Sequence, residues 1–308
     1  MRMVIAGGSG FLGRALTQSL VSAGHRVKVL TRQPGGTGAG WAAEGSNPDR
    51  VTWSPDGGLG PWAQACDGAD VLINLAGESI GARRWSHLRK AQLIASRMLP
   101  TRSLVAFVSA AAAKPALLVS SSAVGYYGDR GDERLTEAAR DGEDFLAELC
   151  YEWEREAAKA HSDRTRVVLV RTGIVLDPAE GALAKMVPPF RLFAGGPFGS
   201  GRQVMSWIHR DDWVSLVAWI AESSSLDGPI NATAPNPVTN AEFARALGRA
   251  LKRPAFLPAP AFALKLLLGE MAQALLLSSQ HVIPERALAG GFRFRFETVD
   301  EALASLLG

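Results

Sequence analysis

Cysteine is scarce in this chain, where Cys66 and Cys150 are the only two thiols among 308 residues. Two cysteines without metal-ligand spacing predict neither a disulfide framework nor a zinc site. The five histidines are too scattered to suggest an imidazole cluster, so we expect no metal. No charged leader with an apolar core precedes the first strand-like run, and export is not expected. These absences favour a reducing cytoplasm.

Long uninterrupted apolar runs are also lacking. The most apolar late stretch, Ala255 to Leu277, contains Pro258, Pro260, Lys265 and Glu270. These residues exclude an unbroken membrane span. The stretch is more typical of a buried or half-buried helix, and we expect no membrane partner.

A strong excess of charge of either sign is missing, because the chain has 33 Lys and Arg and 30 Asp and Glu, which gives a net charge of +3. The basic residues form no long tract and do not alternate with aromatics, so we expect no nucleic-acid partner. An anionic cofactor and a small-molecule substrate are enough to explain the bias. A homodimer stays open, because no sequence feature argues for one.

A glycine-rich turn is the most informative feature that is present. The sequence Gly7-Gly8-Ser9-Gly10-Phe11-Leu12-Gly13 follows a strand-like run and opens an amphipathic helix. Glycines at this spacing allow a tight turn and a close approach of the backbone to a pyrophosphate, which the helix N-terminus also attracts. The context predicts a dinucleotide site, with an empty tight turn as the alternative.

The second strand lacks the carboxylate that would select NAD. In NAD-binding folds an acidic residue about 20 residues after the glycine turn binds the ribose 2′-hydroxyl. Here the first acidic residue is Glu44, and Thr31 and Arg32 occupy the strand end. A hydroxyl and a guanidinium suit a 2′-phosphate, so the sequence favours NADP. The alternative is that Arg32 is an ordinary solvated loop residue.

Apolar strands alternate with helix-like segments along most of the chain, which predicts an α/β fold with a Rossmann-type doubly wound parallel sheet. Strands are expected at Met3 to Ala6, Arg26 to Leu30, Val71 to Leu75, Ala116 to Ser120, Arg166 to Arg171 and Pro229 to Thr233. Gly35 to Gly60 is predicted to be a surface excursion, with a short strand around Val51 to Trp53. Irregular spacing after Leu176 predicts a nucleotide domain at 1–176 and 207–234. A smaller, mainly helical substrate lobe is then expected at 177–206 and 235–308, with a cleft between the two.

Several further motifs resemble the extended short-chain dehydrogenase/reductase superfamily, and the resemblance covers essentially the whole chain. It is carried by the glycine turn, Asn74-Leu75-Ala76-Gly77, Ser120-Ser121-Ser122-Ala123 and Trp207-Ile208-His209-Arg210-Asp211-Asp212. An atypical epimerase-family branch, often labelled SulA-type or nucleoside-diphosphate-sugar epimerase-like, is indicated by five segments. These are Ser122-Ala-Val-Gly-Tyr-Tyr-Gly128, Asp144-Phe-Leu-Ala-Glu-Leu-Cys-Tyr-Glu-Trp-Glu154, Arg171-Thr-Gly-Ile-Val-Leu176, Gly195-Gly-Pro-Phe-Gly-Ser-Gly-Arg-Gln203 and Gly269-Glu-Met-Ala272.

The resemblance implies further cofactor contacts. The small residues of Asn74-Leu75-Ala76-Gly77 permit backbone approach to a ribose or pyrophosphate, and Asn74 can brace the loop. By resemblance, Leu75 and Ala76 line the adenosine side and Val175 lies near the nicotinamide. Gln92 and Arg97 are weaker candidates, for which a solvated helix face is an equal alternative.

Catalysis in ordinary members needs a serine, a tyrosine and a lysine four residues after the tyrosine, which places both on one helix face. Ser122 fits the serine, but no lysine occurs from Leu146 to Arg155. Three frames are open: Leu146 with Cys150, Cys150 with Glu154, and Tyr151 with Arg155. The resemblance favours a frame based on Cys150 and Trp153-Glu154, which leaves Tyr151 at the surface or boundary.

Two neighbouring tyrosines offer other proton donors, because Tyr126 and Tyr127 follow Ser122 at the end of its strand. Their alternative role is aromatic packing. We take Ser122 and Tyr126 as the catalytic candidates. The arginine expected two residues after Gln203 is absent, so a nucleotide sugar is not the default substrate.

His209 and the pair Asp211-Asp212 look catalytic but are interpreted as structural. One of the two aspartates is expected to cap the helix that begins near Trp213, while His209 tethers the loop. The chain is thus predicted to be an NADP(H)-binding oxidoreductase or epimerase-like enzyme on an unidentified small molecule. The alternative is a non-catalytic NADP(H)-sensing protein that binds a partner.

Overall fold

A seven-stranded sheet forms the centre of the molecule. We describe residues 1–32 and 48–308 of a computed structural model. The strands lie in the order β3-β2-β1-β4-β5-β7-β11 and all neighbours are parallel. Their bounds are β1 Arg2–Ala6, β2 Arg26–Thr31, β3 Asp49–Thr52, β4 Val71–Asn74, β5 Leu117–Ala123, β7 Arg166–Thr172 and β11 Gly228–Ala232. The strand order reverses between β1 and β4, which opens a crevice at the carboxyl ends of these two strands.

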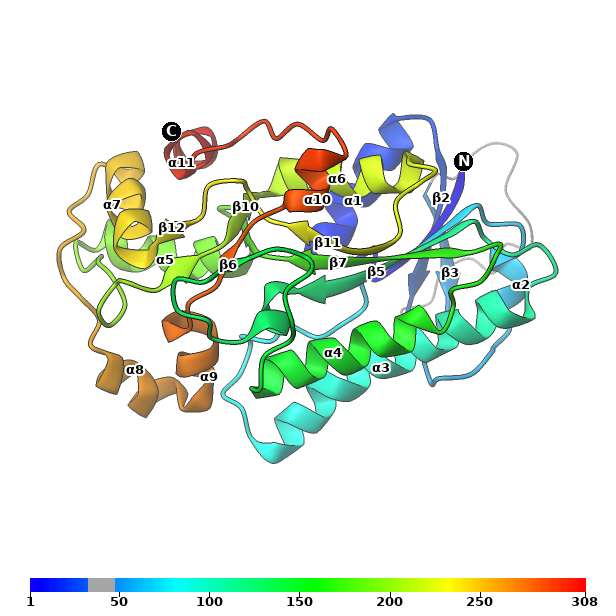
Figure 1. Ribbon diagram of the computed structural model, residues 1–308, viewed down its shortest axis with the longest axis horizontal. Coiled ribbons are helices and arrows are strands. Elements are labelled where there is room, and N and C mark those ends of the chain that lie inside the picture. Colours follow the sequence, from blue (N-terminus) through cyan, green and yellow to red (C-terminus); the bar gives the residue numbers. More distant parts are fainter. Residues whose placement is uncertain (33–47) are drawn as a thin grey trace.

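Two helical layers cover the two faces of the sheet (Figure 1). On one face lie α1 (Phe11–Ser22) and α6 (Arg210–Glu222), and on the other lie α2 (Trp62–Cys66), α3 (His87–Ala110) and α4 (Phe145–Ala158). The strands supply both cores, because alternate residues point to opposite faces: Met3 and Ile5 join the first core, and Val4 and Ala6 the second. The predicted doubly wound sheet is confirmed.

A third core lies beside the sheet, where the short strands β8 (Ile174–Leu176) and β10 (Trp207–His209) pair with each other. It packs α5 (Gly181–Arg191), α7 (Asn240–Leu251) and α11 (Val299–Leu307) together. β10 therefore does not join the large sheet. Of the segment 207–234, which was predicted to belong to the nucleotide domain, only the strand β11 joins that sheet. Since Leu176 and Trp207 pack in this third core, the proposed division at 177–206 and 235–308 stays a prediction.

Short elements complete the chain. They are η1 (Val124–Tyr127), β6 (Arg134–Leu135), β9 (Val204–Met205), β12 (Val238–Thr239), α8 (Ala261–Leu268), α9 (Glu270–Ala272), η2 (Gln273–Leu277), β13 (His281–Val282) and α10 (Glu285–Ala289). α8 has no buried residue, but Ala261, Ala263, Leu264 and Leu268 are half-buried, so the segment is half-buried and its large side chains Phe262, Leu266 and Leu267 are exposed. No helix among the described residues is long and apolar enough to cross a bilayer.

The predicted excursion from Gly35 to Gly60 falls partly outside the described residues, as does Glu44. Its short strand is present as β3, which pairs with β2. Both cysteines are free and buried. Across residues 1–32 and 48–308, no group of three or more His, Cys, Asp or Glu side chains could hold a metal ion.

Candidate functional site

The glycine turn packs tightly against the ends of β1 and β4. Gly7 has a positive φ of 79°, and a Cβ there would lie 2.6 Å from the carbonyl oxygen of Leu75. A Cβ on Gly13 would lie 2.2 Å from the carbonyl oxygen of Gly7. Both positions therefore require glycine, since any side chain would push α1 and the β4 loop away from the turn.

The N-terminus of α1 faces this turn. Gly10 is its N-cap, and neither a capping side chain nor an acidic first-turn residue is present in this described helix. Peptide N–H groups at such an end are donors for an anion. Arg14 binds the carbonyl of Ser9 at 2.8 Å and the carboxylate of Glu180, so this helix is tied to the loop before α5.

The start of α5 packs beside the glycine turn and β8. A Cβ on Gly181 would lie 3.3 Å from the Phe11 ring and 3.6 Å from the carbonyl oxygen of Val175. Val175 itself is buried on β8. Phe11, from the glycine turn, and Val175, which the resemblance placed near the nicotinamide, are thus close to one another across the crevice.

Thr31 and Arg32 stand at the carboxyl end of β2, the strand next to β1. Thr31 is buried and Arg32 is exposed. A charged guanidinium at this edge is open to an anion that arrives from solvent. Their assignment to a 2′-phosphate stays a prediction.

The loop after β4 is braced from below by a buried network. Asn74 accepts from the backbone N–H of Ala76 at 3.2 Å and donates to the Thr101 hydroxyl at 2.9 Å. That hydroxyl also accepts from the Trp153 indole at 2.9 Å. The amide of Asn74 therefore fixes the backbone of Leu75 and Ala76 at the crevice, which is the bracing role expected from the sequence.

Arg97 supports the same loop rather than forming part of a solvated helix face. Its guanidinium donates to the carbonyl of Glu78 at 3.0 Å and lies 5.3 Å from the Trp153 ring centroid. Its aliphatic stem lies under Gly77, where a Cβ would be 3.4 Å from Arg97 Cγ. Burial lowers the pKa of Arg97.

Gln92 is exposed and lines a cavity of about 340 Å³ with Glu78, Arg83 and Arg89, among others. Arg89 binds the Glu78 carboxylate and donates to the carbonyl of Ser79 at 2.9 Å. The Nε of Arg89 is buried without a hydrogen-bond partner. This cavity adjoins the β4 loop, so a polar group entering it would meet two arginines.

Ser122 is buried at the end of β5 and its hydroxyl donates to Glu154 at 2.6 Å. The same carboxylate receives two 2.8 Å hydrogen bonds from Arg171 on β7. This bidentate pair is inside the protein, where an ion pair needs such hydrogen bonds to offset desolvation. The single O–H donor of Ser122 is therefore used inside the protein, and only the oxygen lone pairs are left to accept from a ligand.

Two tyrosines follow Ser122 and have different environments. Tyr127 is fully buried, donates to Asn231 at 2.7 Å and accepts from Arg171 at 3.0 Å, and burial raises its pKa to about 12. Tyr126 is only half-buried, and the Arg171 guanidinium lies 3.5 Å from its ring centroid. Burial raises the pKa of Tyr126, and the charge of Arg171 opposes the rise.

The face of α4 that meets β5 carries no lysine and no tyrosine. Leu146, Cys150 and Glu154 are buried at four-residue spacing on this face, and Leu146 lies against Gly125. Burial raises the pKa of Cys150 to about 12, which keeps its thiol neutral. Tyr151 is 39% exposed, as the sequence predicted for a surface or boundary residue. Its frame with Arg155 points away from the β5 edge.

Sequence reasoning exchanged the roles of His209 and the neighbouring aspartates. His209 is the N-cap of α6 and accepts from the N–H of Asp211 at 3.0 Å. Asp212 instead accepts from the N–H groups of Arg295 and Phe296, both at 2.9 Å, and so fixes the chain before α11. Both groups are structural, but the predicted aspartate cap is wrong because the helix begins three residues earlier than expected.

Arg171 lies in one of the motifs that carry the family resemblance, but sequence reasoning did not single it out as a functional residue. The signal that could have found it is a charged residue directly after the apolar run Val-Val-Leu-Val. A buried charge in a central strand requires a partner. The matching carboxylate, Glu154, lies in one of the three frames considered for α4.

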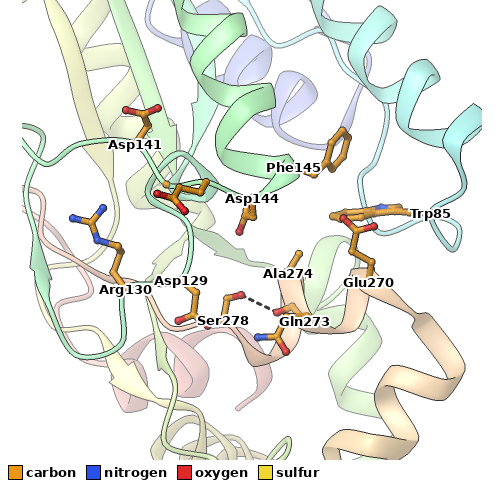
Figure 2. A pocket seen from close by; sticks show the side chains of 12 residues that line it. Trp85, Asp129, Arg130, Asp141, Asp144, Phe145, Glu270, Gln273, Ala274 and Ser278 are labelled. Atoms are coloured by element: carbon orange, nitrogen blue, oxygen red, sulfur yellow. Dashed lines mark hydrogen bonds between the residues drawn. The ribbon is translucent and has the colours of Figure 1, made fainter.

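A larger cavity of about 580 Å³ lies at the N-terminus of α4 (Figure 2). Trp85 and Phe145 meet edge to face along one side, with ring centroids 5.2 Å apart, and Glu270 lies beside them. Asp129, Arg130 and Ser278 lie on the other side in Figure 2. None of the predicted cofactor residues lines this cavity, so it is distinct from the crevice between β1 and β4.

Comparisons with known proteins agree with this geometry. Residues 3–232 match the NAD dependent epimerase/dehydratase family, and residues 259–306 match a domain of unknown function, DUF1731. The chain is 41% identical over 309 residues to the chloroplastic epimerase family protein SDR39U1 homolog of Arabidopsis thaliana, covering 100% of this chain and 87% of the relative. It is 39% identical to the Bos taurus epimerase family protein SDR39U1, covering 100% of both chains.

Solved structures give the same result. The human epimerase family protein SDR39U1 with NADPH superposes with a TM-score of 0.89 at 36% identity, covering 100% of this chain and 99% of that chain. The UDP-glucose 4-epimerase of Thermus thermophilus in complex with NAD has a TM-score of 0.75 at 17% identity, covering 100% and 98%, and shares the fold. With the glycine turn, the strand order and the family match in agreement, the chain belongs to the NAD dependent epimerase/dehydratase family.

Proposed function

We propose that this protein is an NADP(H)-dependent oxidoreductase that reduces a carbonyl group of a small molecule. The observation that carries the proposal is the half-buried phenol of Tyr126, which lies over Arg171 beyond the carboxyl end of β5. A protonated phenol at a dinucleotide crevice can complete a reduction. NADPH, when bound, supplies a hydride to the carbonyl carbon.

The cofactor part of the proposal uses the crevice and the human relative solved with NADPH. The turn residues Gly7, Ser9, Gly10, Phe11, Leu12 and Gly13 hold the pyrophosphate at the start of α1. Thr31 and Arg32 bind the 2′-phosphate. The remaining contacts come from Leu75, Ala76, Gly77, Gln92, Arg97 and Val175, where Arg97 acts by holding the β4 loop in place.

The chemical part assigns different tasks to Tyr126 and Ser122. As the hydride arrives at carbon, the carbonyl oxygen gains a pair of electrons, and Tyr126 gives it a proton and is re-protonated from water. The Ser122 hydroxyl donates its hydrogen bond to Glu154, so Ser122 positions the substrate as an acceptor rather than as a donor. Arg171 stabilises negative charge on the phenol while the proton moves.

Sugar-nucleotide epimerisation has less support in this chain. Gln203, which ends the glycine-rich loop, donates instead to the carbonyls of Phe198 at 3.1 Å and Leu276 at 2.8 Å. Arg202 is exposed and has no arginine partner two residues after Gln203. Without an anion clamp, a small neutral or singly charged carbonyl compound suits the crevice better than a diphosphate.

The test is NADPH oxidation measured by absorbance against a panel of aldehydes, ketones and quinones. Tyr126→Phe is expected to lower kcat by about 100-fold or more, with the Kd of NADPH within about twofold of the parent. Tyr151→Phe, on the outer face of α4, is the matched control and is expected to leave kcat unchanged. Because the donor must keep its proton, the rate is expected to stay flat near neutrality and to fall only as the pH rises above the ordinary tyrosine value of about 10.

Two results would contradict the reductase proposal. One is full activity of Tyr126→Phe, and the other is a rate that rises through alkaline pH. Tight NADPH binding without oxidation of any panel member would favour the non-catalytic alternative instead. One contact supports that alternative by joining the loop after β4 to the helices that follow β8. In the loop 78–85, the Gly81 carbonyl accepts from Lys185 Nζ of α5 at 2.8 Å. Lys90, on the following helix α3, also pairs with Glu270 at 2.7 Å.

A further inference from the structure

An apolar surface is exposed around α8, at the end of the molecule opposite β3 (Figure 1). We call it the α8 surface, and its residues are Leu192, Phe193, Phe256, Leu257, Phe262, Leu266 and Leu267. Five of these side chains, namely Leu192, Phe256, Phe262, Leu266 and Leu267, are each at least 71% exposed. Scattered exposed leucines are ordinary, but a group of large apolar side chains marks an interaction site.

Two chain segments form this surface and are bound to each other. The N–H of Leu257 donates to the Gly195 carbonyl at 3.1 Å, and Gly199 and Pro197 bind the backbone of Ala259 at 2.8 Å each. The guanidinium of Arg253 lies 4.8 Å from the Phe193 ring centroid. The end of α5 and the approach to α8 therefore present their apolar side chains together.

Phe193 holds a backbone conformation that suits glycine better. Its φ is +60°, and its N–H donates to the Phe190 carbonyl at 3.0 Å as the chain leaves α5. A large side chain in this left-handed region is uncommon, and glycine is the usual residue after a helix end. Since 58% of Phe193 is exposed, packing inside the protein does not account for a phenylalanine there.

Positive charges predominate in the chain segments that carry the α8 surface, and the acidic residues Glu180, Glu242 and Glu270 flank these segments. Residues 181–209 and 243–269 contain no Asp or Glu, but they contain Lys185, Arg191, Arg202, Arg245, Arg249, Lys252, Arg253 and Lys265. All eight are exposed, and one of them, Arg249, pairs with Asp300. A second copy of this chain would bring the same positive charges against them across a two-fold axis, which disfavours self-association. The surface also contributes no lining residue to either cavity described above, so it offers no groove from them for a partner helix.

We propose that the α8 surface docks on an anionic lipid bilayer. The phenylalanine and leucine side chains enter the boundary between headgroups and acyl chains, and the lysines and arginines contact lipid phosphates. The protein lies on the membrane and does not span it. This differs from the sequence-based expectation of no membrane partner, which rested on the prolines and charges that exclude an unbroken membrane span between Ala255 and Leu277.

Co-sedimentation with vesicles tests the proposal. The parent protein is expected to bind vesicles of three parts phosphatidylcholine to one part phosphatidylglycerol at least tenfold more tightly than pure phosphatidylcholine. Leu266→Glu with Leu267→Glu is expected to weaken this binding at least tenfold. The matched control is Leu88→Glu with Ile94→Glu, which makes the same charge change at exposed apolar residues of α3 and is expected to stay within twofold.

A second pair of substitutions tests the charges separately. Arg253→Glu with Lys265→Glu is expected to weaken binding by about fivefold or more for each basic residue lost. Thermal unfolding and circular dichroism check that each variant is folded. If Leu266→Glu with Leu267→Glu does not fold, the result for Arg253→Glu with Lys265→Glu decides the proposal. Equal binding to both vesicle types, or no binding to either, would overturn the proposal. So would a concentration-dependent dimer that Leu266→Glu with Leu267→Glu dissolves, because a second copy would then be the occupant.

Discussion

The glycine turn lies at the carboxyl end of β1 and the inner face of α4 packs on β5 and β7 of the same sheet. The two regions differ in how well they keep the pattern of ordinary short-chain dehydrogenases and reductases. At the turn, Gly7 and Gly13 leave no room for a Cβ against neighbouring backbone. On α4, the buried residues Leu146, Cys150 and Glu154 make up two of the three frames considered for the tyrosine and lysine, and none of them is a tyrosine or a lysine. The turn acts through its backbone and tolerates no side chain at Gly7 or Gly13, whereas α4 acts through side chains that can be replaced while the helix keeps its place.

A buried ion pair joins α4 to β7 at the position considered for the catalytic pair. Glu154 joins Ser122 on β5 to Arg171 on β7, and Arg171 in turn meets both tyrosines. The network ties α4 to two central strands through charge-assisted hydrogen bonds. We infer that binding and catalysis have separated in this chain, so that cofactor binding stays at the turn and proton donation moves to the residues that follow β5.

The largest effect is expected at the turn. Gly13→Ala places a Cβ 2.2 Å from the Gly7 carbonyl oxygen, so α1 must shift. The shift is expected to disrupt the proposed pyrophosphate site. We expect the Kd of NADPH to rise at least 100-fold by fluorescence titration. Gly10→Ala is the graded control, because its Cβ would lie 3.2 Å from the same oxygen and needs only a small adjustment. Equal, small effects of both substitutions would contradict the packing argument.

A large effect on stability is expected at the buried pair. Glu154→Gln leaves the Arg171 charge without its counter-ion, and losing one partner of such a pair costs about 3–5 kcal/mol of unfolding free energy. Urea denaturation measures this loss. Glu152→Gln, in the exposed pair with Arg155, is the matched control and is expected to cost less than about 1 kcal/mol. Similar costs for both variants would show that the network does not hold α4 in place.

A smaller and more selective effect is expected at Arg32. Arg32→Ala removes the charged hydrogen bond that we propose to the 2′-phosphate, and we expect the Kd of NADPH to rise about 10- to 100-fold. The Kd of NADH is expected to stay within twofold, because that cofactor lacks the phosphate. Arg26→Ala, exposed at the start of the same strand, is the control. An unchanged preference between the two cofactors in Arg32→Ala would remove Arg32 from the site.

The smallest effect is expected at Cys150. Its thiol is neutral and buried, with a pKa of about 12, so it is suited neither to proton transfer nor to nucleophilic attack. Cys150→Ala is expected to leave the Kd of NADPH and the rate of NADPH oxidation within about twofold. The native protein is also expected to resist aromatic disulfide reagents. A tenfold loss of rate in Cys150→Ala would contradict this account and indicate that the proton donor lies on α4.

Sequence predicted the features that depend on the backbone and on periodicity. The seven strands of the sheet were expected near their observed positions, because apolar runs and the glycine turn mark them directly. Tyr151 was also placed correctly outside the site by helix periodicity, whereas the exchange between His209 and Asp212 was not foreseen. The residue at which α6 begins determines which side chain caps it. Sequence patterns locate a helix end only to within a few residues, and tertiary packing determines the exact position.

Contacts between residues that are distant in the sequence were the second feature that the sequence did not predict. Glu154 and Arg171 are 17 residues apart and meet only when α4 packs across β5 and β7. The exposure of α8 was likewise missed, because an apolar sequence gives the same signal for a buried helix as for one that faces a partner. Local sequence therefore predicts the turn, while the charged network and the α8 surface depend on which segments meet in three dimensions.

A crystal structure of the protein with NADPH and a carbonyl substrate tests most directly the claim that binding and proton donation have separated. We predict that the pyrophosphate lies at the start of α1 and that Tyr126 Oη is within proton-transfer distance of the substrate oxygen beside the nicotinamide C4. No ionisable group of α4 is expected at that distance. A nicotinamide ring placed against Cys150 or Glu154, with Tyr126 turned away, would contradict the account.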